Sequence, residues 1–337
     1  MIKACIVTSS FYGRNRLFDL KDPVSNRDNC LHSMAALRDE LHCRGIDLQT
    51  HDMIPLEQAE VVVFSDMPAE IPERRAGQKF ILLAIESLAV LPRNFSTELY
   101  RHFDRVFTWH DELVDESKVV KINYAFDLQV GPHPSFAERP DFMCAIANNK
   151  RSDDPNELYT KRREIITWYE RTHPGDLNLY GAGWDYIGGG ALVARILRKV
   201  RLGKLLRSRQ YDKTWRGIAH QKTPILLRHR FNLCFENIRD VPGYITEKIF
   251  DCFFTGCVPV YLGAGNVSAH IPRGCFIDFR DFDSCEDLHL FLKGIDSRKY
   301  AEHQEEAAAF LRSALGQKFS SAHFARTVAD QISVICR

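Results

Sequence analysis

One stretch of the chain, residues 228–263, places the strongest constraint on the fold. The segment 231–235 is bulky and alternating, which is typical of a buried strand, and it ends in Glu236 and Asn237. A polar loop with Asp, Pro and Gly follows over 238–243, then an apolar helix over 249–255 and a strand over 258–262. The order strand, loop, helix, strand predicts a parallel α/β unit, which holds its ligand at the carboxyl ends of the strands.

The start of the predicted helix has the chemistry of an anion site. Thr246 is placed as the N-cap and Glu247 falls in the first turn. Lys248 then lies beside the unpaired N–H groups of the helix start, and together they suit a diphosphate. The alternative is that Glu247 and Lys248 belong to a solvated face and the segment is only structural.

The residue string resembles the donor-site signature of the α-1,3/1,4-fucosyltransferases, glycosyltransferase family 10. That pattern is Phe-x-Leu-x-Phe-Glu-Asn, a short loop, Tyr-x-Thr-Glu-Lys, and Gly-x-x-Pro-x-x-x-Gly, and every fixed position is present between Phe231 and Gly263. A further similarity covers 271–282, and weaker ones cover most of the chain.

The resemblance implies an α/β, GT-B-like fold with two Rossmann-like domains facing across a cleft, the C-terminal one binding GDP-fucose. It assigns Glu247 to fucose or ribose hydroxyls and Lys248 to the pyrophosphate. It places Asn237, Tyr244 and Thr246 in the same donor pocket.

A second cation is predicted upstream. The segment 157–166 is similar to the family's Tyr-x-x-Arg helix, in which Arg162 has the spacing of the diphosphate-binding arginine and Arg163 is the alternative. Arginine binds phosphate bidentately and stabilises charge on a leaving nucleotide. Otherwise both arginines are ordinary surface residues of a helix.

The candidate general base is Glu86. It follows the apolar, strand-like run 80–85, and a carboxylate at the end of a buried parallel strand is where catalysis is expected. Partial burial is expected to raise its pKa, and the family's Glu-Ser pair matches Glu86 and Ser87. The alternative is a structural glutamate that caps the next element.

Three polar segments are candidates for the acceptor side. Asn26 and Arg27 lie in a loop before a predicted helix, and the family has a similar Asn-Arg-Asp segment. His110 follows the strand 105–108, and 148–150 follows the strand 142–147. Each is also compatible with an ordinary polar strand end.

The length of 337 residues suits two domains. We expect an acceptor-side domain over 1–135, a donor domain over 142–295, and C-terminal helices over 297–337 that pack back on the first domain. The first domain is predicted to contain strands over 2–8, 46–50, 60–64, 79–85 and 105–108 and a helix over 30–44. The net charge of +1 gives no indication of nucleic-acid binding.

The ten cysteines are read as reduced thiols, because several sit in apolar patterns and no Cys-x-x-Cys occurs. No metal ligands or cofactor are predicted. The chain starts directly with an apolar strand and shows no membrane-length apolar run. Because the resemblance implies an N-terminal anchor and stem in the eukaryotic members of the family, we expect a bacterial-type enzyme in the cytoplasm.

The stretch 191–209 carries seven Lys or Arg and no acidic residue, with apolar residues at helical spacing. This pattern is typical of a helix on an anionic membrane surface. The alternative is a helix packed on the core with basic residues facing water. The first reading predicts peripheral contact with the inner face of the bacterial inner membrane.

The leading hypothesis is an inverting transfer of L-fucose from GDP-β-L-fucose to a hydroxyl of a glycan acceptor, in cell-surface polysaccharide or lipopolysaccharide synthesis. Glu86 would deprotonate that hydroxyl while Lys248 and Arg162 stabilise the departing GDP, without a metal. One alternative is the same fold with another nucleotide-sugar donor. The other is a nucleotide- or glycan-binding protein without turnover.

Overall fold

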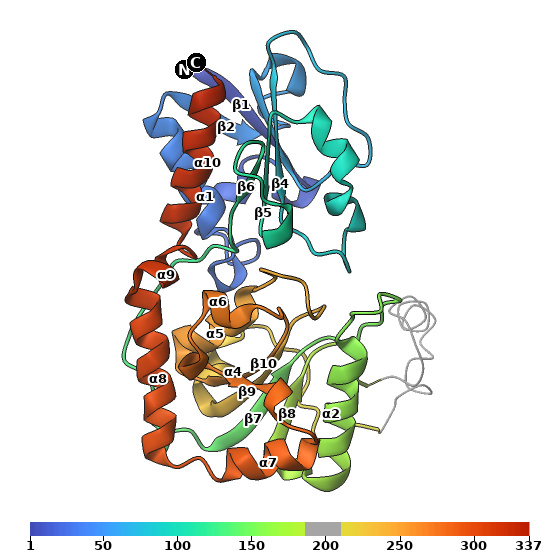
Figure 1. The fold of residues 1–337 in the computed structure, drawn as a ribbon, viewed down its shortest axis with the longest axis vertical. Helices are drawn as coiled ribbons and strands as arrows, with labels where there is room; N and C mark the ends of the chain where they lie inside the picture. The colour runs from blue at the N-terminus through green and yellow to red at the C-terminus, as the bar shows by residue number, and fades with distance from the viewer. Residues whose placement is uncertain (186–209, 337) are drawn as a thin grey trace. The chain divides into compact units, whose positions relative to one another are not determined.

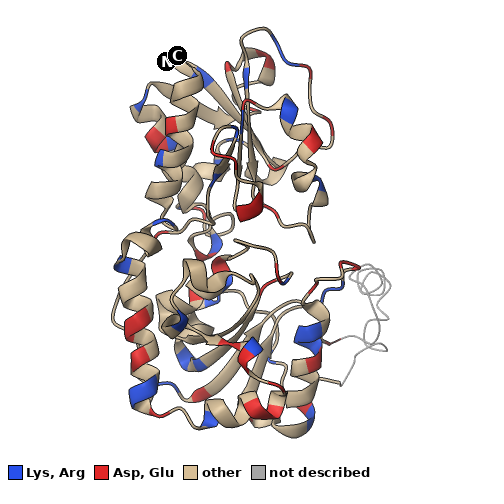
Figure 2. Cartoon of the chain, in the orientation of Figure 1, with Lys and Arg blue, Asp and Glu red and all other residues tan. Residues whose placement is uncertain are grey.

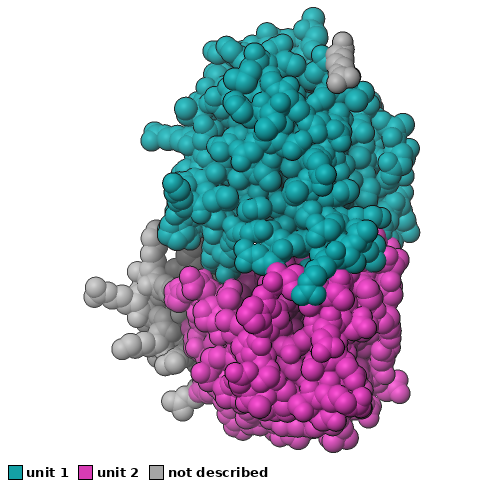
Figure 3. All heavy atoms as spheres, turned by 90° about the vertical axis from the view of Figure 1, so that its left-hand side faces the viewer, with its two compact units in different colours: residues 1–129, 241–245, 311–337 teal, residues 130–240, 246–310 magenta. Residues whose placement is uncertain are grey.

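The computed structural model describes residues 1–185 and 210–336. The helix predicted over 191–209 therefore lies outside the described residues. The described chain forms two compact units, coloured separately in Figure 3. Unit 1 contains 1–129, 241–245 and 311–337, and unit 2 contains 130–240 and 246–310.

Unit 1 is built on a parallel six-stranded sheet with the order β2-β1-β3-β4-β5-β6. Its strands are β1 (Ile2–Val7), β2 (Ile46–Thr50), β3 (Val61–Ser65), β4 (Lys79–Ala84), β5 (Arg105–Thr108) and β6 (Val119–Lys121). The central strands β3 and β4 are almost wholly buried, as expected for parallel strands covered on both faces. Five of the strands match predicted segments closely, whereas β6 was not predicted.

Two long helices cover one face of this sheet (Figure 1). Helix α1 (His32–Cys43) and the C-terminal helix α10 (Ser321–Ile335) share one apolar core with the strands, and the short α9 (Ala314–Gln317) precedes α10. Leu37, Leu41, Val328 and Ile332 are fully buried in this core. The end of the chain is thus an integral layer of unit 1.

Unit 2 has a parallel five-stranded sheet with the order β11-β10-β9-β7-β8. The strands are β7 (Asp141–Ile146), β8 (Leu177–Tyr180), β9 (His229–Phe235), β10 (Val258–Leu262) and β11 (Ile277–Asp278). The helices are α2 (Tyr159–Thr172), α4 (Thr223–Arg228), α5 (Glu247–Thr255), α6 (Val267–His270), α7 (Cys285–Lys293) and α8 (Ser297–Arg312). The strand–loop–helix–strand unit predicted from 231–262 is present as β9, α5 and β10.

The units differ from the predicted domains in three places. The boundary falls at 129/130, α8 is assigned mostly to unit 2, and the five residues Val241–Ile245 belong to unit 1 although the chain on both sides of them is in unit 2. The loop before α5 therefore belongs to unit 1, although α5 itself belongs to unit 2.

Charged residues of both signs are interspersed on the described elements, for example along α2 and α8 (Figure 2). This agrees with the net charge of +1. Among the described residues, no helix combines the length and apolar character that crossing a membrane requires.

Candidate active site

The site predicted for the donor is organised around a buried carboxylate at the end of β9. The side chain of Glu236 is fully buried, and it accepts hydrogen bonds from the backbone N of Thr246 at 2.8 Å and from the Thr246 hydroxyl at 2.7 Å. The Nζ of Lys248 lies 3.2 Å from the same carboxylate. Glu236 therefore fixes the start of α5 against the end of the strand.

Helix α5 begins as the sequence predicted, with one difference. Thr246 occupies the N-cap position, but its hydroxyl donates to Glu236 and does not cap the helix. Glu247 is the first helical residue, and Gly256 closes the helix in the left-handed conformation at φ 66°. These positions leave the first turn of α5 at the carboxyl edge of the sheet, where a ligand is expected.

Two lysines and two further carboxylates complete this cluster. Lys222 Nζ is 2.7 Å from Asp251 and 3.5 Å from Glu247, and Lys248 Nζ is 3.7 Å from Glu247. Burial works to raise the pKa of Glu247, but Lys248 and Lys222 outweigh it and lower the pKa well below its usual value. Burial raises the pKa of Asp251 to about 7 against the opposing effect of Lys222. A diphosphate would compete with these carboxylates for the lysine charges.

Arg162 holds the end of β9 from the other side. It lies on α2, is 5% exposed, and donates to the carbonyl oxygens of Phe235 at 2.7 Å and Glu236 at 3.0 Å. Asn237 is half-buried, and its carbonyl accepts from the backbone N of Leu158 at the start of α2. The contacts of Arg162 and Asn237 with a donor remain predictions.

The loop Val241–Ile245 is anchored in unit 1 by aromatic packing. The ring of Tyr244, which is 2% exposed, lies 4.8 Å from the Trp109 ring and 6.2 Å from the Tyr124 ring. The backbone N of Asp111 donates to Pro242 at 3.2 Å. Tyr244, predicted to line the nucleotide pocket, is thus largely covered by unit 1 aromatics.

The same aromatics hold the backbone beside Glu86. The Ile85 carbonyl accepts from the Trp109 indole and from the Tyr124 hydroxyl, each at 2.7 Å. Asp66 Oδ1 accepts from the backbone N of Ile85 at 2.7 Å and of Glu86 at 2.8 Å. The candidate base therefore sits on a backbone held from several directions.

Partial burial of Glu86 was predicted, and this is wrong: the residue is exposed. Strand β4 ends at Ala84, so Glu86 lies in the bend beyond the sheet. The burial of the strand residues therefore does not extend to Glu86. Ser87 next to it is fully buried.

Of the acceptor-side candidates, Asn26, Arg27 and His110 lie in unit 1, whereas 148–150 lie in unit 2. His110 is half-buried and stacks on Trp109 at 5.7 Å, and burial lowers its pKa. Asn26 makes local hydrogen bonds to Leu20 and Leu31, whereas Arg27 is exposed beside Asp28. Their contact with an acceptor stays a prediction.

Sequence reasoning missed three features of the two units. Asp66 and Lys222 belong to no recognisable motif. The fold brings Asp66 next to the backbone of Glu86 and Lys222 next to the carboxylate of Glu247. No metal ligands were predicted, yet the fold gathers His173, Asp176 and His289. The His-x-x-Asp spacing at 173–176 could have indicated two metal ligands, but the third ligand, His289, is distant in the chain.

The comparisons with known proteins concern the region that contains β9 and α5 and the fold of the chain. Residues 200–310 match the family model described as glycosyltransferase family 10 (fucosyltransferase), C-terminal part. This region is therefore similar to the C-terminal part of glycosyltransferase family 10. The match contains β9, α5 and β10 with Glu236, Thr246, Glu247 and Lys248, whereas Arg162 lies before it.

Relatives of known name align with short parts of the chain. An α-(1,3)-fucosyltransferase of Helicobacter pylori is 34% identical over 80 residues, which are 24% of this chain and 16% of that enzyme. The α-(1,3)-fucosyltransferase 4 of Mus musculus is 43% identical over 83 residues, 24% of this chain and 18% of that enzyme. The alignments thus span less than a fifth of either relative.

Solved structures show the fold over the whole chain. An α1,3-fucosyltransferase with GDP-fucose matches with a TM-score of 0.57 at 17% identity, covering 100% of this chain and 90% of that one. The structure of Anabaena HepE with UDP and glucose matches with a TM-score of 0.56 at 12% identity. The match covers 99% of this chain and 100% of that one. The fold is GT-B, with two parallel-sheet α/β units as predicted.

Replacing Gly243 is expected to disturb the loop Val241–Ile245 and the start of α5 that follows it. Its φ is +81°, and an added Cβ would overlap the carbonyl oxygen of Trp109. We expect Gly243→Ala to destabilise the protein by about 2 kcal/mol or more and to weaken GDP binding, because the loop leads directly into Thr246 and α5. Thermal melting and GDP titration measure the two effects.

Gly77→Ala is the matched control. Gly77 has φ +79° with no atom within 4 Å of the added Cβ, so it carries the same backbone strain without the overlap. Equal losses in the two variants would show that the Trp109 contact does not matter.

Proposed function

We propose that the protein is an inverting fucosyltransferase that moves L-fucose from GDP-β-L-fucose to a hydroxyl of a glycan acceptor. The observation that carries the proposal is the Glu236-centred start of α5, with Thr246, Glu247 and Lys248, inside the region that matches family 10. The relatives are named as α-(1,3)-fucosyltransferases, and a solved structure of the same fold is an α1,3-fucosyltransferase with GDP-fucose; both support this reaction and donor.

The reaction is a single displacement at the anomeric carbon. Glu86 takes the proton of the acceptor hydroxyl as its oxygen bonds to C1 of fucose, and the C1–O bond to the diphosphate breaks with both electrons leaving on GDP. The attack from the opposite face inverts β-fucose to the α-linkage. The exposed position of Glu86 supports access by a large acceptor.

In this mechanism the protein supplies the positive charge for GDP. Lys248, Lys222 and the N-terminal end of α5 lie together, and Arg162 is the further cation predicted from the sequence.

Transfer is therefore proposed to need no metal ion, and initial rates of transfer should be the same with EDTA as with added Mg²⁺ or Mn²⁺.

The test is product formation with radiolabelled GDP-fucose and a panel of glycan acceptors. Turnover with GDP-fucose above other nucleotide sugars supports the proposal. Turnover with only a different donor favours the alternative of another nucleotide-sugar transferase, and the UDP complex of a GT-B neighbour illustrates that this fold accepts such donors. Donor binding without turnover on any acceptor favours a binding protein.

A lipid-linked or lipopolysaccharide acceptor at the cytoplasmic side of a membrane is part of the proposal. It is supported only by the basic, amphipathic composition of 191–209. We expect co-sedimentation with anionic but not zwitterionic liposomes. Equal or absent binding to both would remove this part and leave the transfer reaction untouched.

A further inference from the structure

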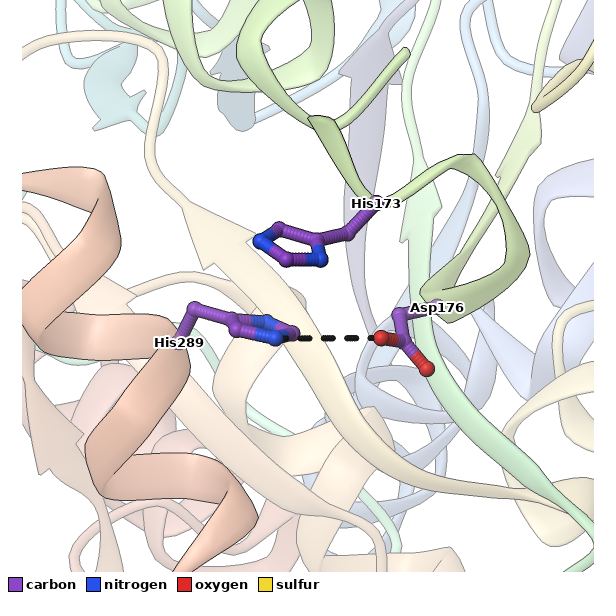
Figure 4. Close-up of side chains that lie close together, drawn as sticks. All are labelled: His173, Asp176 and His289. Atoms are coloured by element: carbon purple, nitrogen blue, oxygen red, sulfur yellow. Dashed lines mark ion pairs between the residues drawn. The ribbon is translucent and has the colours of Figure 1, made fainter. Parts of the chain in front are cut away.

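A group of metal-binding side chains in unit 2 lies outside the donor site. His173, Asp176 and His289 each offer one ligand atom, and these atoms lie within 4.8 Å of one another (Figure 4). His173 follows α2, Asp176 ends the short turn Pro174–Asp176, and His289 projects from α7. We call these three residues the His–Asp cluster.

The His–Asp cluster is at the opposite edge of the sheet from the donor residues. Asp176 directly precedes the first residue of β8, whereas Glu236 directly follows the last residue of β9. Both strands pair in parallel with β7, so the start of one and the end of the other lie at opposite edges. The cluster therefore has no part in the proposed transfer.

Asp176 is already oriented as a ligand. Its Oδ1 accepts an ion-paired hydrogen bond from Lys293 at 2.7 Å, and its Oδ2 faces His289 Nε2 at 3.8 Å. Metal-binding carboxylates are commonly held in this way, with one oxygen bound by a neighbour and the other free for the ion.

His289 is a buried histidine with an unsatisfied ring. It is 4% exposed, and its Nδ1 has no hydrogen-bond partner among the described residues. Aromatic rings surround it, including Trp168 at 5.9 Å and Tyr169 at 5.7 Å.

His173 supplies the second imidazole. Its ring stacks on His289 at 4.0 Å with an interplanar angle of 14°, so its nitrogens lie beside those of His289 (Figure 4). The side chain is 33% exposed, which leaves room for the ring to turn out of the stack. In a tetrahedral zinc site, bonds of about 2.0–2.1 Å separate ligand atoms by roughly 3.4 Å, close to the 3.8 Å between His289 and Asp176.

We propose that His173, Asp176 and His289 bind a divalent transition-metal ion, for which Zn²⁺ is the best match. Two imidazoles and one carboxylate are a donor set that zinc accepts, and a water or Glu286 takes the fourth position. Glu286 precedes His289 by three residues on α7, and its carboxylate is 3.8 Å from His173. The ion would fasten the end of α2 to α7 and so stabilise unit 2.

The direct test is metal binding to the whole protein after EDTA treatment and desalting. Isothermal titration with ZnCl₂ should give one site per chain, and saturating zinc should raise the melting temperature by about 5 °C. Co²⁺ in place of zinc should give visible absorption bands typical of a tetrahedral site. Absence of zinc binding, or of a shift in melting temperature, overturns the proposal.

Variants locate the site. His173→Gln and Asp176→Asn should each weaken zinc binding at least about 10-fold and remove the thermal shift, since each loses a ligand. His42→Gln, an exposed histidine on α1 in unit 1, is the matched control and should bind zinc as wild type does. Unchanged zinc binding in His173→Gln, or equal loss in His42→Gln, contradicts the assignment. These variants avoid the buried His289, whose replacement would also disturb folding.

Discussion

Glu86→Gln is expected to lower kcat for fucosyl transfer about 100- to 10,000-fold, the range typical for loss of a general base. The amide keeps the size of the side chain but cannot take the acceptor proton. The backbone at this position is held by Asp66, Trp109 and Tyr124, so the substitution should leave the local structure in place. GDP binding, which we propose takes place in unit 2, should be unchanged, and steady-state kinetics with a GDP titration separates the two effects.

Glu98→Gln is the control for this prediction. Glu98 is an exposed glutamate of unit 1 in the turn Thr97–His102, so the same change of charge is made on the same unit. It should keep wild-type kcat. If Glu86→Gln keeps more than a tenth of the activity, another group must take the proton and the assignment of Glu86 is wrong.

Local patterns were sufficient to predict the elements that build the donor site. The segments 231–235 and 258–262 are short apolar runs bounded by polar or glycine residues, and α5 has both a first-turn acid and Gly256. These signals depend only on neighbours in the chain. The three-residue strand β6 was missed because so short a run carries little periodicity.

Long-range features could not be predicted in the same way. Asp66 reaches Glu86 because β3 and β4 are neighbours in the sheet and their carboxyl ends coincide. Lys222 reaches Glu247 because α4 packs near α5. The passage of 241–245 into unit 1 depends on the fit of Tyr244 to Trp109, which no local pattern shows.

Burial was also misjudged where a strand ends. The apolar run before Glu86 indicated that Glu86 is partly buried. In the structure, burial of the side chains ends where the hydrogen-bonded strand ends, at Ala84. Arg162 shows the opposite case, since a residue predicted to reach a ligand is buried and binds two carbonyl oxygens at the end of β9. Its guanidinium therefore holds the backbone at the end of β9 in position.

Lys248→Met is expected to reduce both stability and activity. The Glu236 carboxylate is fully buried and would keep its two hydrogen bonds from Thr246 but lose its ion pair with Lys248. Breaking a buried ion pair on one side costs about 3 kcal/mol or more. Loss of the lysine charge should also weaken donor binding and slow GDP departure, so kcat/KM should fall at least about 100-fold. Thermal melting and steady-state kinetics measure these effects.

The double variant Lys248→Met with Glu236→Gln separates the two roles of the lysine. An amide at 236 removes the unpaired buried charge and can still accept from Thr246, so most of the lost stability should return. Activity should stay low, because no cation replaces Lys248 at the diphosphate. Recovery of activity together with stability would mean that Lys248 serves only to neutralise Glu236, and the donor's charge would then have to be met by Lys222 and the helix start.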